Sequence, residues 1–233
     1  MSAAAEQERK IWRLTPKNAG TPVYLEVGAK RVFASAADWP GWTRSGKDEK
    51  AALEALADAA PRYAEAAKSA RVSFPSTEGD HFDVVERLPG SATTDYGAPG
   101  AIAKGDSRPL SRAEADRQCA LLEGSWTILD RVVAKAPAAL RKGPRGGGRD
   151  RDKIVDHVLD AEDAYAHKLG LRLARPDRQD SAAVREFRAA IVAAVRAGAN
   201  ASPIDKNWPV RYAVRRTAWH ALDHAWEIEN RSV

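Results

Sequence analysis

Four consecutive helical patterns fill the second half of the chain, and each is followed by residues that end helices. Ser111 opens the first with the capping box SRAE, and Pro137 follows its end. Gly170 and Gly198 follow the second and third. Amphipathic helices of this length, joined by loops, are the components of a helix bundle. The patterns predict helices over about Ser111 to Ala136, Asp150 to Leu169, Ser181 to Arg196 and Pro209 to Arg231.

The first hundred residues have a different character. TPVYLEV and KRVFASAADW are rich in β-branched and aromatic residues and are joined through Gly28, which is typical of a short hairpin. Ser45 or Asp48 is positioned to cap an alanine-rich helix that runs to Ala70. RVSFP and FDVVERL are two further candidate strands.

The stretch GSATTDYGAPGAIAKGDSRP concentrates Gly, Pro, Ser and Thr, which favours an exposed connection. We therefore expect an α+β protein with a small α/β domain over residues 1–100, a linker over 101–110 and a four-helix bundle over 111–233. Between the first two bundle helices, KGPRGGGRDRD is glycine-rich and basic. That composition favours a solvated, flexible loop over an anion-binding loop.

Charge and cysteine content narrow the possible functions. The net charge is +5, but 37 basic and 32 acidic residues make a mixed surface, so a nucleic-acid partner is not favoured. The single cysteine, Cys119, excludes an intrachain disulfide and a metal site built from several thiolates. The first residues lack the apolar core of a signal peptide and no run is apolar enough to span a bilayer, so we expect a cytoplasmic protein without a membrane partner.

Two of the five histidines, His220 and His224, are four residues apart in the last predicted helix. At about 100° per residue both fall at one edge of its core-facing stripe, and this spacing lets two imidazoles converge on one ion. In the second predicted helix, His157 lies at the edge of the apolar face, whereas His167 points to the opposite side. Three imidazoles are a common catalytic metal set. The alternative is a set of structural histidines that are hydrogen-bonded in a core.

Other polar residues are weaker candidates. Glu162 projects inward at an apolar position, so it must either orient a ligand imidazole or lock two helices together. His81 lies in the polar turn EGDHFD and is expected at the surface. Cys119 is expected to be an inert buried thiol.

These features resemble the DinB/YfiT-like superfamily over roughly residues 108–233: HVLDAE in the second helix and WHALDHAWEIENR in the fourth carry the three histidines in that family's order. The resemblance implies that His157, His220 and His224 bind a divalent metal, often zinc or nickel, at one end of the bundle. It also implies chemistry on low-molecular-weight thiols, such as thiol S-transfer or isomerisation, or hydrolysis.

A fainter resemblance covers roughly residues 20–70. A hairpin followed by DWPGWTRSGKDEKAALEALADAA is similar to HicB-like domains, and we carry over only the local fold.

Large aromatic residues form a second strip on the fourth helix. Trp219 and Trp226 point away from the histidines, and exposed aromatics of this size usually cover another surface. Docking of the N-terminal half and a homodimer contact are the two alternatives. Trp39 and Trp42 are expected to pack in a core rather than to line a substrate cavity.

Two functions from different classes remain. The first is a metal-dependent enzyme that activates a thiol or water toward a small-molecule substrate, with a thiol S-transferase-like reaction favoured. The alternative is a non-catalytic metal-binding or regulatory module that contacts a partner protein.

Overall fold

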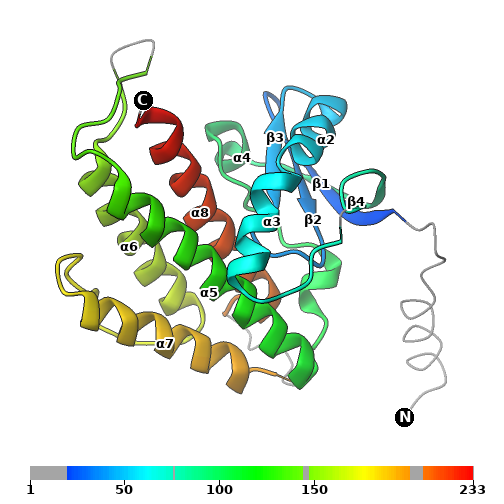
Figure 1. The fold of residues 1–233 in the computed structure, drawn as a ribbon. Helices are drawn as coiled ribbons and strands as arrows, with labels where there is room; N and C mark the ends of the chain where they lie inside the picture. Colours follow the sequence, from blue (N-terminus) through cyan, green and yellow to red (C-terminus); the bar gives the residue numbers. More distant parts are fainter. Residues whose placement is uncertain (1–19, 76, 144–146, 200–206, 233) are drawn as a thin grey trace.

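A computed structural model describes residues 20–75, 77–143, 147–199 and 207–232. The expected α+β class is confirmed: a small mixed sheet and short helices precede a helical C-terminal half (Figure 1). The strand order is β3-β2-β1-β4. β1 pairs antiparallel with β2, as the hairpin prediction requires, and parallel with β4. The strands are β1 Thr21–Val27, β2 Val32–Ala36, β3 Thr43–Gly46 and β4 Phe82–Pro89.

The alanine-rich segment forms two helices, α2 Glu49–Asp58 and α3 Ala60–Ser69, so the prediction of a single helix to Ala70 is wrong. Asp48 caps α2, as expected. The break falls at Ala59 because Pro61 has no N–H for the continuing hydrogen-bond ladder and its ring crowds the preceding turn.

One strand prediction near this segment is wrong. RVSFP is not a strand: the N–H of Val72 bonds to the carbonyl of Ala67 at the end of α3, and the ring of Phe74 packs 4.8 Å from that of Trp39. Residues 43–46, for which no strand is predicted, form the edge strand β3. Pairing with β2 makes this segment a strand although Val and Phe give RVSFP the higher strand propensity.

The four long helices lie where the sequence predicts them, and the Ser111 capping box is present. α8 contacts α5 and α6, and α7 contacts α5. No helix in the described ranges is both long and apolar enough to cross a membrane. The four are α5 Arg112–Lys135, α6 Arg151–Lys168, α7 Ser181–Ala197 and α8 Val210–Arg231.

Residues 90–110, whose composition suggests an exposed connection, are exposed only in part. They include the short helices α4 Ala92–Tyr96 and η1 Lys104–Ser107, and they bury Thr94, Asp106 and Leu110. The buried carboxylate of Glu26 accepts hydrogen bonds from the backbone N–H groups of residues 100 and 101 at 2.9 and 2.8 Å. Backbone groups of this segment therefore find hydrogen-bond partners in the sheet.

One continuous cluster of buried apolar residues crosses from the sheet to the long helices. Gly124 in α5 shows how close the two halves come: a Cβ there would lie 2.5 Å from the carbonyl oxygen of Ala66 in α3. The glycine costs α5 some helical stability but allows this crossing. The division near residue 100 stays a prediction about folding units.

The aromatic strip of α8 packs against the first half of the chain, which favours the inter-domain alternative over a homodimer contact. The ring of Trp219 meets Phe33 of β2 edge-to-face at 6.1 Å, and the guanidinium of Arg44 lies 4.0 Å from the ring centroid of Trp226. Both tryptophans are almost completely buried. Trp39 and Trp42 are buried beside Tyr63, so the expectation that they pack in a core is confirmed.

A buried ion pair also joins α8 to residues 90–110. The guanidinium of Arg215 bonds to the carboxylate of Asp106 and stacks on Tyr24, with 4.5 Å between its central carbon and the ring centroid. Both charged side chains are less than a tenth exposed. Removing one partner of such a pair leaves an uncompensated buried charge.

We therefore predict that Asp106→Asn lowers the free energy of unfolding by about 3 kcal/mol, measured by denaturant titration. The amide keeps the shape of the side chain but removes its charge. Glu54→Gln is the matched control, because it breaks an exposed pair with Lys50 and should cost less than about 0.5 kcal/mol. Equal effects of the two substitutions would contradict the role given to the buried pair.

Candidate metal centre

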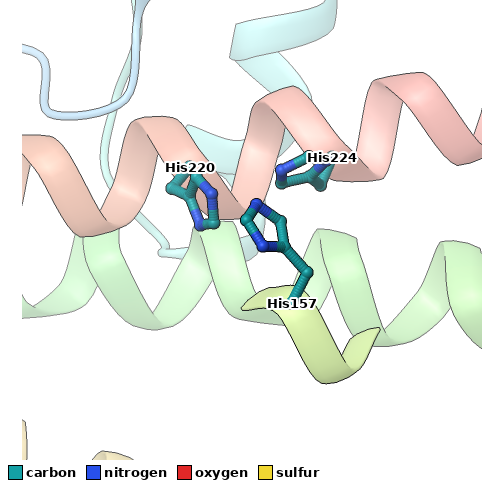
Figure 2. A group of neighbouring side chains, drawn as sticks. All are labelled: His157, His220 and His224. Atoms are coloured by element: carbon teal, nitrogen blue, oxygen red, sulfur yellow. The ribbon is translucent and has the colours of Figure 1, made fainter. Parts of the chain in front are cut away.

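Three histidines from two helices converge at the contact between α6 and α8. Figure 2 shows the ring of His157 reaching from α6 toward His220 and His224 on successive turns of α8. One ligand nitrogen from each ring lies within 4.8 Å of the others. The ring centroids are 5.1, 5.0 and 4.6 Å apart. The structure thus brings together the three residues that the helical spacing singles out.

Packing of the helices explains this convergence. Ile154 and Val158 of α6 are buried in the core, which turns the neighbouring position 157 toward α8. On α8, His220 is 6% exposed and the side chain of His224 is 12% exposed. The site therefore lies at the boundary between core and solvent, and an ion there is partly screened from water.

Burial sets the protonation state of His157 and His220. Burial is the main cause that lowers the pKa of both side chains, and the pKa of His220 falls well below its ordinary value. The charges of the neighbouring histidines act in the same direction. These two imidazoles are thus neutral at pH 7 and have lone pairs available for a metal. Nδ1 of His220 is buried, and no group in the described residues hydrogen-bonds to it.

Glu227 orients the third ligand. Its carboxylate lies 2.8 Å from Nδ1 of His224, and Arg231 pairs with its other oxygen. If Nδ1 donates to this carboxylate, Nε2 is left as the ligand atom, an arrangement found around many metal-bound histidines. Helical periodicity does not single out Glu227, because this residue lies off the stripe of α8 that contains the histidines. Its spacing of three from His224 was the available signal.

Glu162 has the other of its two expected roles. Trp126 of α5 donates to its carboxylate at 2.7 Å and Arg188 of α7 at 3.2 Å, so this buried group locks three helices together and does not orient a ligand imidazole. Burial raises its pKa, while Arg188 and the Trp126 hydrogen bond oppose the rise.

The remaining sequence candidates lie away from the triad. His81 is exposed near Asp83, and His167 is partly exposed near Asp163 on the outer side of α6. Cys119 is buried, and burial raises the pKa of its thiol to about 11, which suits the expected inert role. Part of the basic loop, residues 144–146, lies outside the described residues, so its flexibility stays a prediction.

A cavity of about 410 Å³ lies near the C-terminal end of α6 and the N-terminal end of α8. The three histidines do not line it. Its wall includes Leu169, Leu171, Trp208 and Val210. The ring of Tyr165 lies between this region and the triad, 5.2 Å from Trp208 and 5.9 Å from His220.

The donor set of the triad fits a divalent metal. Neutral imidazoles suit zinc and nickel, and three protein nitrogens leave a coordination position free for water or substrate. The orphaned nitrogen of His220 and the Glu227 contact to His224 are both what a metal site of this kind requires. Comparison of the chain with protein-family models, curated proteins and solved structures finds no match.

The lowered pKa values predict how the metal-free protein responds to pH. Between the folded pKa and the ordinary value of 6.5, the unfolded chain binds protons that the folded chain does not. The free energy of unfolding should therefore fall as the pH drops below about 6.5, with a slope of up to about 1.4 kcal/mol per pH unit for each histidine. Denaturant titrations after dialysis against a chelator measure this slope.

The matched variant is His220→Gln, which removes one of the two groups. It should show a shallower loss of stability than wild type between pH 7 and pH 5. The same slope in both proteins would mean that burial of His220 does not set its protonation state.

Proposed function

We propose that the protein is a metal-dependent enzyme in which His157, His220 and His224 hold one divalent ion, zinc or nickel. The convergence of three ligand nitrogens within 4.8 Å carries this proposal. A metal held there lowers the pKa of a bound thiol or water, which makes it a nucleophile near neutral pH. In the favoured reaction the thiolate sulfur attacks an electrophilic carbon of a small substrate, which forms a C–S bond and breaks the bond to a leaving group that departs as an anion. The alternative is hydrolysis, in which hydroxide derived from water attacks that carbon.

The chain's own residues supply position and shielding. The Glu227 carboxylate fixes the orientation of the His224 ring. Tyr165 and Trp219 lie beside His220, and the ring centroid of each is 5.9 Å from that of the imidazole. These two rings limit the access of water to His220. His157 is only partly buried, so the site is open to solvent on its side.

The ligand count favours an enzyme over the alternative, a module with a structural ion or a regulatory role. Structural zinc sites are closed by four protein ligands. In the part of the chain that the structure describes, the group that could hold a metal has three members. An open position supports chemistry on the ion. The proposal agrees with the resemblance to DinB/YfiT-like proteins and places the reaction in the cytoplasm, where small thiols are kept reduced.

Elemental analysis tests the ligand set. Wild type incubated with zinc or nickel and then desalted should retain about one equivalent of metal, and His220→Ala should retain almost none, because two imidazoles bind far more weakly than three. His167→Ala is the matched control on α6, since His167 faces away from the site and its loss should leave the metal content unchanged.

Activity of the loaded protein separates the two functions. The metal-loaded wild type should accelerate the loss of a small thiol in the presence of a haloarene electrophile, and His220→Ala should not. A wild type that stays metal-free would remove the basis of the proposal. A metal-loaded protein inactive in both transfer and hydrolysis assays would favour the non-catalytic alternative.

Glu227 should tune affinity for the metal. We predict that Glu227→Gln weakens metal binding by about 10-fold to 100-fold, because the amide no longer provides a negative charge beside the ligand imidazole. Competition with a chromophoric chelator gives the dissociation constant. Glu229→Gln, on the same helix but paired with Arg62 at the surface, should bind metal like wild type. Equal affinities in all three proteins would show that Glu227 does not act through His224.

A further inference from the structure

Arg216 lies one helical turn before His220 on α8. Its guanidinium carbon is 4.7 Å from the ring centroid of Trp219 and 5.6 Å from that of Tyr165, the two aromatic residues that adjoin His220. It is partly exposed, and one of its nitrogens donates to the carbonyl of Pro99. Within the described ranges Arg216 forms no ion pair with a carboxylate. Two aromatic faces and one carbonyl therefore fix the position of this charge at the edge of the triad.

The acidic groups around the site are already engaged. Asp160 pairs with Arg175 at 2.7 Å, and Glu227 is shared between His224 and Arg231. Among the described residues, the positive charge of Arg216 therefore has no matching carboxylate at the site.

We propose that Arg216 forms an anion-binding subsite beside the three histidines, which takes the carboxylate or phosphate group of the small molecule that reacts there. The inference rests on the proposed function, because that function places the reacting group at the triad. A guanidinium offers several N–H donors in a geometry that matches carboxylate and phosphate oxygens. A divalent ion on neutral imidazoles adds further positive charge, so the site attracts anions over neutral molecules.

Cobalt-loaded protein provides a test that does not depend on catalysis. A thiolate bound to cobalt gives a charge-transfer absorption band, and the band can be titrated with 3-mercaptopropionate and with its neutral analogue 3-mercaptopropionamide. Wild type should bind the carboxylate compound about tenfold more tightly than the amide, a preference typical of one charge-assisted hydrogen bond. In Arg216→Gln this preference should fall to about one, with the affinity for the amide unchanged.

Arg131→Gln controls for net charge, since it removes an exposed arginine from α5 and should keep the wild-type preference. Acetate and inorganic phosphate, followed by their effect on the cobalt d–d bands, repeat the comparison without a thiol.

Three outcomes are distinguishable. Equal preferences in wild type and Arg216→Gln would overturn the subsite while leaving the metal site intact. If neither thiol gives a charge-transfer band but acetate or phosphate perturbs the d–d bands in an arginine-dependent way, the subsite stands and the thiol reaction fails. Failure to bind cobalt would overturn the proposed function and the subsite with it.

Discussion

Helix α8 is enclosed on two sides at once, and this double burial determines the arrangement of the rest of the molecule. One side packs against α5 and α6, and the other meets the sheet and residues 90–110. A charged group in such a helix is stable only when a partner compensates for its lost hydration. Arg215 meets this requirement through Asp106 and the ring of Tyr24. That ion pair anchors the first half of the chain on α8.

The histidine face satisfies the same requirement in a different way. His220 and His157 avoid the cost of a buried charge because burial keeps them neutral. Neutral imidazoles still have lone pairs that need partners, and Nδ1 of His220 has none among the described residues. A metal ion would satisfy the three rings together. Features that destabilise a metal-free core are therefore the same features that prepare a binding site.

Helix-capping and helix-terminating residues predict the long helices well, because caps, prolines and glycines act locally. The histidine triad was also predictable, since helical periodicity fixes which side chains share a face.

Tertiary contacts explain the failures. RVSFP has the higher strand propensity, but pairing with β2 selects residues 43–46. Residues 90–110 hydrogen-bond through their backbone to Glu26 of β1, a partner that the sequence does not reveal. Glu162 is engaged by Arg188 of α7, and Glu227, which helical periodicity does not single out, contacts His224 instead.

X-ray absorption spectroscopy of the zinc-loaded protein tests the central claim most directly. The account predicts three nitrogen neighbours at about 2.0–2.1 Å with the multiple-scattering signature of imidazole, and one further light ligand in the open position. In His220→Ala this imidazole signature should weaken or disappear along with the bound metal. A spectrum without imidazole scattering, or one with a sulfur neighbour at about 2.3 Å in protein free of added thiol, would contradict a site built from His157, His220 and His224.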